Sequence, residues 1–246
     1  MEMKIESQQD LFPQSSSQPT WPTREEALQK FQSFNPSRYT KTRNFLNGHI
    51  SQMSPHIKHG VIQNRELLNI IQDKFNFQES EKFIQELAWR DFWRSYAYHH
   101  PDQLWKDVEE YKTGFKPNDY LDNLPEDIKK GETPTQVINS FIHELTQTGY
   151  LHNHARMYVA SYVVHFRRVK WQAGAKFFMT HLLDGDLASN NFSWQWIAST
   201  FAGKPYIFNL ENVYKYCHQT LSIEPQQNQE IDGSYDEISA RLFPNL

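Results

Sequence analysis

Apolar residues recur every three or four positions in several stretches of the chain, which is the spacing of a helix with one face against a core. The clearest stretches carry Leu67, Leu68, Ile71 and Phe75, then Phe83, Ile84, Leu87 and Ala88, then Val137, Ile138, Phe141, Ile142 and Leu145. Val and Ile are otherwise scattered, and no Asn-Gly or Asp-Gly pair is flanked by alternating apolar residues as in a hairpin. The pattern predicts an all-α fold.

The polar start of the chain contrasts with the helical stretches after it. Residues 1–20 are rich in Gln and Ser and predict a flexible tail, because they offer too little apolar surface to bury. Thr23 stands three residues before Glu26 and ahead of Leu28, a spacing typical of a capping box at the start of a helix. We therefore expect a helical domain over residues 21–217.

Two later segments interrupt the helical pattern. Three prolines divide the stretch from about 101 to 131, which predicts surface connections. Residues 218–246 are mostly polar and predict a C-terminal extension. Only a few of its residues are able to dock on the domain: Ile238, Leu242 and Phe243.

Composition narrows the class of protein. Apolar residues make up 38% of the 246 positions and aromatic residues 15%, so the core is built largely from rings. The single Cys217 excludes an internal disulfide framework and a multi-cysteine metal site, and it favours a cytoplasmic location. No apolar run is long enough for a membrane helix. A formal net charge of −4 argues against a nonspecific polycation but leaves room for a local basic face.

A second helical face accompanies the apolar stripe that begins at Phe83. Glu86, Trp89, Arg90 and Trp93 follow one another at helical spacing and so share this second face. One interpretation is a solvated face with two half-buried rings. The other is a pocket wall that combines a carboxylate, a guanidinium and two stacking rings.

Small and polar residues share one face of the helix that begins after residue 151. They are Asn153, Arg156, Met157 and Ala160. This composition suggests that the face packs closely against a partner that is not an apolar part of the protein. A metal site built from His152 and His154 is disfavoured, because residues two apart on a helix point in different directions.

Two further segments offer polar groups at helix starts. The segment 184–196 holds two carboxylates, three carboxamides and two indoles, but it fails as a calcium loop at Ala188, Ser189 and Gln195. Its simplest role is an aspartate cap on a helix. Ser51 and Ser54 precede another expected helix, where hydroxyls and free backbone N–H groups can hold a phosphate.

Together and in this order, these segments resemble the FAD-binding domain of the DNA photolyase/cryptochrome family. The likeness runs from about residue 23 to 209. Its most specific parts are TGYLHNHARM at 148–157, WQAG at 171–174, LDGDLASNN at 183–191 and WQW at 194–196; YTKTR at 39–43 and the stretch 51–60 are similar to the family's phosphate-binding region. The resemblance implies an all-helical domain that holds FAD, without the family's N-terminal α/β antenna domain.

The resemblance also implies roles for individual residues. Those expected to bind FAD are Tyr39, Ser51, Met53, Ser54, Arg90, Arg156, Asp184, Asp186 and Asn190, with Arg156 paired to Asp184 and Asn190 near N5 of the flavin. Those expected to contact DNA or its lesion are Arg43, Glu86, Trp89, Arg90, Trp93, Asn153, His154, Met157 and Trp196. The catalytic set is Glu86, Asn153, Met157 and Asn190, and no metal is expected.

Electrons for flavin reduction would pass through Trp194 and Trp171. No tryptophan falls at the family's third position, near Asn118, so Tyr120 or Phe115 is the candidate for the outer step.

The activity implied by the resemblance is light-dependent repair of cyclobutane pyrimidine dimers by electron transfer from reduced FAD. Relatives that repair the other major photoproduct tend to have His where this chain has Asn153 and Met157. Single-stranded DNA is the expected preference, because it costs less to splay. The expected partner is therefore dimer-containing DNA, with no membrane and no antenna pigment in this chain. The alternative is a cryptochrome-like blue-light receptor whose FAD is photoreduced without repair.

Overall fold

The computed structural model describes residues 22–246, and within them the only β-structure is an isolated bridge between Leu121 and Val169. The α-helices are α1 (Arg24–Gln32), α2 (Pro36–Thr42), α3 (Ser54–Lys58), α4 (Asn64–Gln72), α5 (Phe77–His99), α6 (Glu126–Lys130), α7 (Gln136–Thr148), α8 (Asn153–Ser161), α9 (Trp171–His181), α10 (Leu187–Ala198), α11 (Leu210–Cys217) and α12 (Tyr235–Leu242). A π-helical turn, η4 (Tyr162–Phe166), extends α8. The all-α prediction is confirmed, whereas the tail expected at 1–20 lies outside the described residues.

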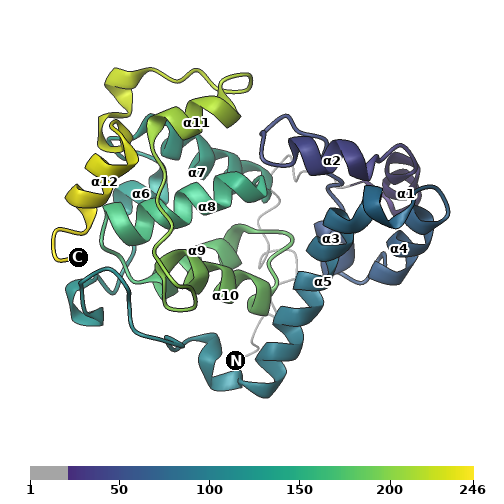
Figure 1. Cartoon of the computed structure of the whole chain (residues 1–246), viewed down its shortest axis with the longest axis horizontal. Helices are drawn as coiled ribbons and strands as arrows, with labels where there is room; N and C mark the ends of the chain where they lie inside the picture. The colour runs from purple at the N-terminus through teal and green to yellow at the C-terminus, as the bar shows by residue number, and fades with distance from the viewer. Residues whose placement is uncertain (1–21) are drawn as a thin grey trace, which may run out of the picture.

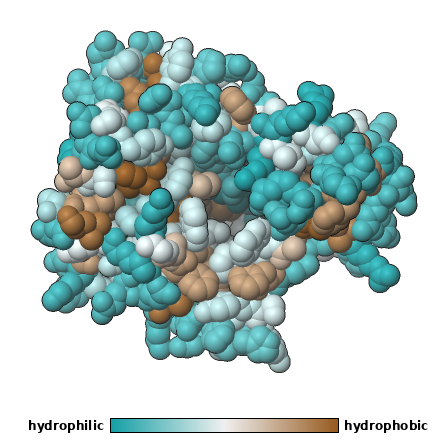
Figure 2. Space-filling view, viewed as in Figure 1, coloured by the Kyte–Doolittle hydropathy of each residue, from teal (hydrophilic) through white to brown (hydrophobic). Residues whose placement is uncertain are grey.

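The helices form two groups joined by α5, the longest of them. Helices α1–α4 gather on one side in Figure 1, and α6–α12 gather on the other. A small core of Phe31, Leu67 and Phe83 holds the first group, and a larger core built mainly by α7–α10 holds the second. Figure 2, seen from the same direction, shows the surface hollowed between the two groups.

Local sequence explains where the main helices begin. Thr23 and Glu26 form the expected capping box of α1, and Asn76 forms another with Glu79 at the start of α5. Asp186 caps α10 by accepting a hydrogen bond from the backbone N–H of Ser189, as its position predicted. The three apolar stretches predicted as helices lie in α4, α5 and α7.

The stretch from 101 to 131 is more than a surface connection. It is largely irregular, with the short 3₁₀ turns η2 (Pro101–Leu104) and η3 (Pro117–Asp119) before α6. Tyr111, Tyr120 and Ile128 are nevertheless buried in the larger core, and the two tyrosine rings stack with centroids 4.4 Å apart. The sequence did not indicate this burial, because widely spaced aromatic residues leave no periodic pattern.

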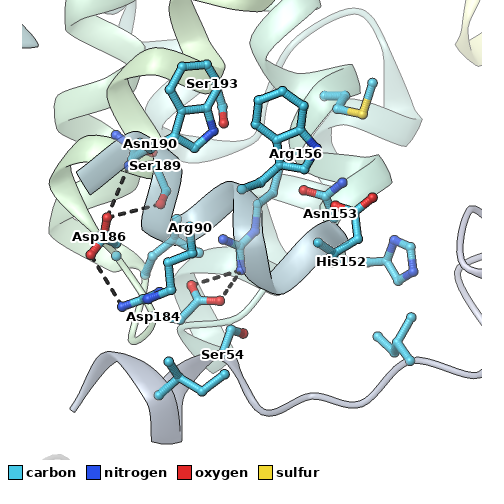
Figure 3. Close-up of a pocket in the computed structure, with 18 of the residues that line it drawn as sticks. Ser54, Arg90, His152, Asn153, Arg156, Asp184, Asp186, Ser189, Asn190 and Ser193 are labelled. Atoms are coloured by element: carbon cyan, nitrogen blue, oxygen red, sulfur yellow. Dashed lines mark hydrogen bonds and ion pairs between the residues drawn. The ribbon is translucent and has the colours of Figure 1, made fainter. Parts of the chain in front are cut away.

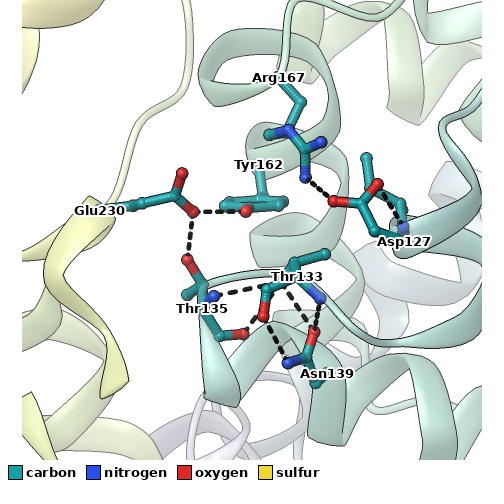
Figure 4. A network of polar contacts seen from close by, with 8 residues as sticks. Asp127, Thr133, Thr135, Asn139, Tyr162, Arg167 and Glu230 are labelled. Carbon is teal, nitrogen blue, oxygen red and sulfur yellow. Dashed lines mark hydrogen bonds and ion pairs between the residues drawn. The ribbon is translucent and has the colours of Figure 1, made fainter. Parts of the chain in front are cut away.

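The C-terminal extension docks firmly on the helical domain. Ile238, Leu242 and Phe243 are buried, as expected, but they are not the only ones, because Ile231 is fully buried in the larger core. No sequence pattern indicated the polar anchor in Figure 4, where Glu230 accepts hydrogen bonds from the hydroxyls of Thr135 (2.7 Å) and Tyr162 (2.5 Å). These bonds tie the extension to the start of α7 and to η4.

His165 gives the fold a predictable dependence on pH. Its ring is fully buried, its Nε2 lies 2.9 Å from the carbonyl oxygen of Ile197, and burial lowers its pKa from 6.5 to about 4. Between pH 6.5 and 4 the unfolded chain therefore takes up a proton that the folded protein does not. We expect this group alone to remove about 3 kcal/mol of stability over that interval, with none lost above pH 6.5.

The control for this prediction is His165→Gln, which offers an amide to the Ile197 carbonyl but does not titrate. Its unfolding free energy in urea is expected to fall less than that of the wild type between pH 7.5 and 4.5. Parallel pH profiles for the two proteins would show that His165 does not carry the effect.

Candidate functional site

A cavity of about 790 Å³ opens between the two groups of helices. One wall comes from α2, the segment 50–54 and α5. The other comes from residues 150–160, in α8 and just before it, and from residues 182–197, in α10 and the loop before it. Its volume lies within the range of small-molecule and cofactor sites. All residues predicted to bind a cofactor line this cavity.

Two ion pairs with buried aspartates line the cavity. Arg156 donates through Nη2 to both oxygens of Asp184, at 2.9 and 2.8 Å, and through Nε to the carbonyl oxygen of Leu151. Arg90 lies 3.3 Å from Asp186. Figure 3 shows Asp184 between the side chains of Arg90 and Arg156, with Asp186 on the other side of Arg90. The pairing of Arg156 with Asp184 is therefore present as expected.

Asp186 is held as a carboxylate by its neighbours. Burial by itself raises its pKa, but hydrogen bonds from the backbone N–H and hydroxyl of Ser189 and the charges of Arg90 and Arg94 lower it below its usual value. Burial lowers the pKa of Arg90, and the carboxylate of Asp186 opposes that shift. Asp186 is therefore a fixed hydrogen-bond acceptor and Arg90 a fixed donor, side by side in a partly desolvated part of the cavity.

The wall formed by α2, the segment 50–54 and α5 carries the residues predicted to meet a pyrophosphate. Tyr39 of α2 and Ser51, Met53 and Ser54 all line the cavity. Met53 is buried and packs in the small core, which fixes the position of the segment that carries the two serines. Burial raises the pKa of Tyr39, so its hydroxyl keeps its proton and can donate.

The outer part of the cavity combines charge with exposed rings. The carboxylate of Glu86 lies 3.3 Å from Arg43 and 2.8 Å from Lys82. Trp89 and Trp196 line the cavity and are 47% and 44% exposed, which leaves large aromatic surfaces open. All four residues of this face of α5 line the cavity, as the pocket-wall interpretation predicts.

Trp93 packs beneath the exposed ring of Trp89. Its ring stacks on Trp89 at 5.5 Å and on Phe192 at 5.4 Å, so it links the exposed indole to the body of α10. Such stacked rings hold Trp89 in one orientation.

The amides and the thioether predicted for catalysis also face the cavity. Asn153 and Met157 lie one turn apart on α8, and Asn190 lies on α10. Asn190 donates from Nδ2 to the carbonyl oxygen of Ala175 at 3.1 Å, which leaves its position fixed from behind. Asn153 is exposed within the open cavity, where it can reach a bound molecule.

Trp194 closes the cavity on the side of α9. Its ring packs against Gly174, where an added Cβ would lie 2.3 Å from Cη2 of the indole. Gly174→Ala is expected to destabilise the protein by about 1–3 kcal/mol through overpacking, which outweighs the better helix propensity of alanine. Thermal unfolding measures the loss.

Gly203→Ala is the matched control, because an added Cβ there meets no atom within 4 Å. The close packing would be shown wrong if both variants unfolded at the wild-type temperature with unchanged tryptophan fluorescence.

Three of the predicted site residues do not line the cavity. His154 is buried, and its Nδ1 lies 2.7 Å from the carbonyl oxygen of Asn44; the ring stacks on Tyr158 and cannot contact DNA, which corrects that expectation. Trp171 and Tyr120 are also buried and lie behind the cavity wall. For Trp171 this position suits an electron relay, whereas for Tyr120 it does not suit an outermost step.

Two buried nitrogen atoms of cavity residues have no hydrogen-bond partner within residues 22–246. They are Nε of Arg90 and Nε2 of His152. Buried polar atoms normally find partners, so both indicate a polar ligand in the cavity. The sequence suggested only a metal role for His152, and no cluster of metal-binding side chains occurs among the described residues. Burial lowers the pKa of His152 to about 4, so its ring is neutral near pH 7.

Residues 83–228, more than half of the chain, match the family model described as the FAD binding domain of DNA photolyase. The chain belongs to this family. The match covers α5 from Phe83 onward and the helices that form the second wall of the cavity.

Individual members of the photolyase group agree with this placement. The chain is 33% identical over 150 residues to the deoxyribodipyrimidine photo-lyase of Streptomyces griseus, which covers 61% of this chain and 32% of that protein. For the enzyme of Alkalihalophilus pseudofirmus the values are 32% over 181 residues, 71% and 37%. The chain thus spans about a third of the length of these curated relatives.

Solved structures show the same fold. The archaeal photolyase from Sulfolobus tokodaii with two FAD molecules superposes with a TM-score of 0.68 at 30% identity, over 82% of this chain and 46% of that one. A cryptochrome from Synechocystis superposes with a TM-score of 0.71 at 24% identity, over 87% and 48%, and shows likeness of fold alone.

The cavity fits the FAD expected of this photolyase family. Its volume, the unpartnered nitrogens of Arg90 and His152, and the hydroxyls of Ser51 and Ser54 together suit a molecule with a large ring system and charged phosphates. FAD is therefore the cofactor that family and geometry both indicate. None of the helices between residues 22 and 246 is long and apolar enough to cross a bilayer.

Proposed function

We propose that the protein splits cyclobutane pyrimidine dimers in DNA when illuminated. One observation carries the proposal: a single cavity holds both the buried ion pairs that suit FAD and a set of exposed rings and polar groups that suit a flipped dimer. The second set consists of Glu86, Trp89, Asn153, Met157 and Trp196. The family membership and the photo-lyase names of the relatives support it.

The rings at the mouth provide the binding energy. A dimer lifted out of the DNA stack loses its stacking partners, and the faces of Trp89 and Trp196 can replace them. Met157 offers a polarisable contact below them. Arg43 adds positive charge at the mouth, where a phosphate of the flipped nucleotide would enter.

The polar residues stabilise the charge that develops in the dimer and hold the dimer in place. FAD bound here in its reduced form would supply the light-driven one-electron chemistry that opens the cyclobutane ring, with the electron returned at the end. Asn153 can donate from its amide to a pyrimidine carbonyl oxygen, where the negative charge develops. The carboxylate of Glu86, fixed by Arg43 and Lys82, can accept from a pyrimidine N–H and so orient the dimer.

Asn190 determines which group faces the flavin on the cofactor side of the cavity. The amide of Asn190 is fixed from behind by Ala175, and a neutral amide at this place supplies no proton to a reduced ring. Asn190 therefore favours retention of the negative charge on which electron donation depends.

We propose single-stranded DNA as the preferred substrate and a cytoplasmic location. A flexible strand presents a dimer without the cost of opening a duplex.

The test uses the purified chain loaded with FAD and chemically reduced. An oligothymidylate that contains cyclobutane dimers is illuminated with it, and recovery of absorbance at 260 nm is followed against a dark sample. Recovery only in light supports the proposal, and a faster rate on single strands than on duplex supports the substrate preference. No recovery from the reduced protein in light, together with photoreduction of a separate sample that holds oxidised FAD, would overturn repair and favour the cryptochrome-like receptor.

A further inference from the structure

We propose that Trp105 is the solvent-side end of an electron route that continues through Trp171 to Trp194, and that Asp107 serves as the charge partner of Trp171. The inference deepens the proposed function, because it concerns how the cofactor of the same cavity is reduced. It adds a residue that the family resemblance missed, since Trp105 stands thirteen positions before the place where a third tryptophan was expected.

The inner half of the route crosses α9. Trp194 lines the cavity and presses against Gly174, which lies three residues after Trp171 and so on the same side of the helix. Both indoles are buried, at 2% and 0% exposure. The absence of a side chain at Gly174 lets the indole of Trp194 approach the turn of α9 that carries Trp171.

The outer half of the route is a stacked pair of indoles. The rings of Trp105 and Trp171 are nearly parallel, with an interplanar angle of 4° and centroids 6.3 Å apart. Trp105 is 38% exposed. Because electron exchange weakens steeply with distance, a pair of rings this close is a favourable step, and one member of the pair meets solvent.

Charged groups around the pair favour oxidation of Trp171. Its Nε1 donates a hydrogen bond of 2.6 Å to Oδ1 of Asp107. A carboxylate at this distance stabilises positive charge on the indole and can accept its proton. Gln172 donates to the same oxygen at 3.2 Å and holds it in place. Near Trp105 the charge is opposite, because Nζ of Lys176 lies 5.6 Å from the ring centroid.

This asymmetry gives the two indoles different tasks. Positive charge rests on Trp171 beside Asp107, and Trp105 is the contact through which an electron enters from outside. Lys176 draws an anionic reductant, such as a thiolate, to that contact. Each cycle moves one electron from the thiolate through Trp105, Trp171 and Trp194 to the cofactor; the thiolate is oxidised by one electron, and any proton passed to Asp107 returns to Trp171.

Tyr120 is the weaker candidate for the outer step. It is 4% exposed, and its hydroxyl shares a hydrogen bond of 2.8 Å with Thr113. Oxidation of a tyrosine requires release of the phenol proton, and the groups that hydrogen-bond to the hydroxyl, Thr113 and Arg168, provide no base. Burial also raises the pKa of the Tyr120 hydroxyl.

The test compares Trp105→Phe, Tyr120→Phe and the wild type, each with oxidised FAD, a thiol and blue light. Trp105→Phe is expected to photoreduce at least about tenfold more slowly, and Tyr120→Phe at close to the wild-type rate. Tyr98→Phe, a change at an 82% exposed ring, is the matched surface control. Wild-type photoreduction in Trp105→Phe, or its loss in Tyr120→Phe alone, would overturn the proposal.

Two further readouts do not depend on turnover. In the apoprotein, near-ultraviolet circular dichroism should lose the contribution of the stacked indoles in Trp105→Phe. In illuminated wild type without thiol, mass spectrometry should find the oxidation product on the stacked pair, Trp171 and Trp105; a product confined to Tyr120 would contradict the route even if Trp105→Phe fails to fold.

Failure of this proposal is distinguishable from failure of repair. Protein reduced chemically needs no route from the surface, so Trp105→Phe prepared in that way should repair dimers at the rate of the equally reduced wild type. Slow photoreduction in Trp105→Phe would support the route even in a protein that repairs nothing.

Discussion

Replacement of Arg156 by alanine is expected to abolish FAD binding and to lower the free energy of unfolding by about 3–5 kcal/mol. The reason is the burial of its partner, since the side chain of Asp184 is only 3% exposed and would lose both hydrogen bonds from the guanidinium. An uncompensated carboxylate at this depth is costly, and it also repels a phosphate or a reduced flavin. The measurements are the ratio of flavin to protein absorbance and unfolding in urea.

A surface ion pair provides the control. Lys129 lies 2.7 Å from Glu126 on α6, with side chains 44% and 70% exposed. Lys129→Ala should change stability by less than about 1 kcal/mol and leave FAD content intact. Full flavin content in Arg156→Ala would show that this ion pair does not organise the cofactor site.

Replacement of Asn153 by alanine is expected to slow dimer repair on the order of 10²-fold while FAD content stays unchanged. The side chain faces the open cavity at the first turn of α8 and makes no hydrogen bond within residues 22–246, so its loss leaves the fold intact. The variant lacks a donor aimed at charge that develops only during ring opening. The measurement is the light-dependent recovery of absorbance at 260 nm per photon absorbed.

Asn118→Ala is the matched control, because Asn118 is exposed on the short turn η3, outside the cavity. It should repair at the wild-type rate. Asn153→Ala repairing dimers at that same rate would remove Asn153 from the mechanism and weaken the assignment of the whole lesion set.

Local patterns were sufficient for the helices and for much of the cavity. The spacing around Leu67, Phe83 and Phe141 predicted α4, α5 and α7, because a helix facing a core must repeat apolar residues at its own period. Hydrogen bonds between near neighbours were also predictable, as for Thr23 at α1 and Asp186 at α10. The resemblance to photolyases then named residues that the structure gathers around one cavity.

Contacts between distant segments were beyond the reach of these patterns. Nothing in the sequence placed Glu230 beside Tyr162, or the irregular stretch that carries Tyr120 inside the core. The same holds for His154, whose place in the motif suggested DNA but whose ring is buried against Tyr158.

Residues close together in the chain are enough to define the all-helical class, the helix starts and the family, because each of these depends on short-range patterns. Three-dimensional packing was needed to establish which face of α5 opens into a pocket, which buried nitrogens lack a partner within the described chain, and that Trp105 stacks on Trp171 from 66 positions away. These outcomes depend on how α5, α8, α9 and α10 pack, and packing is set by the shapes of surfaces that no local pattern encodes.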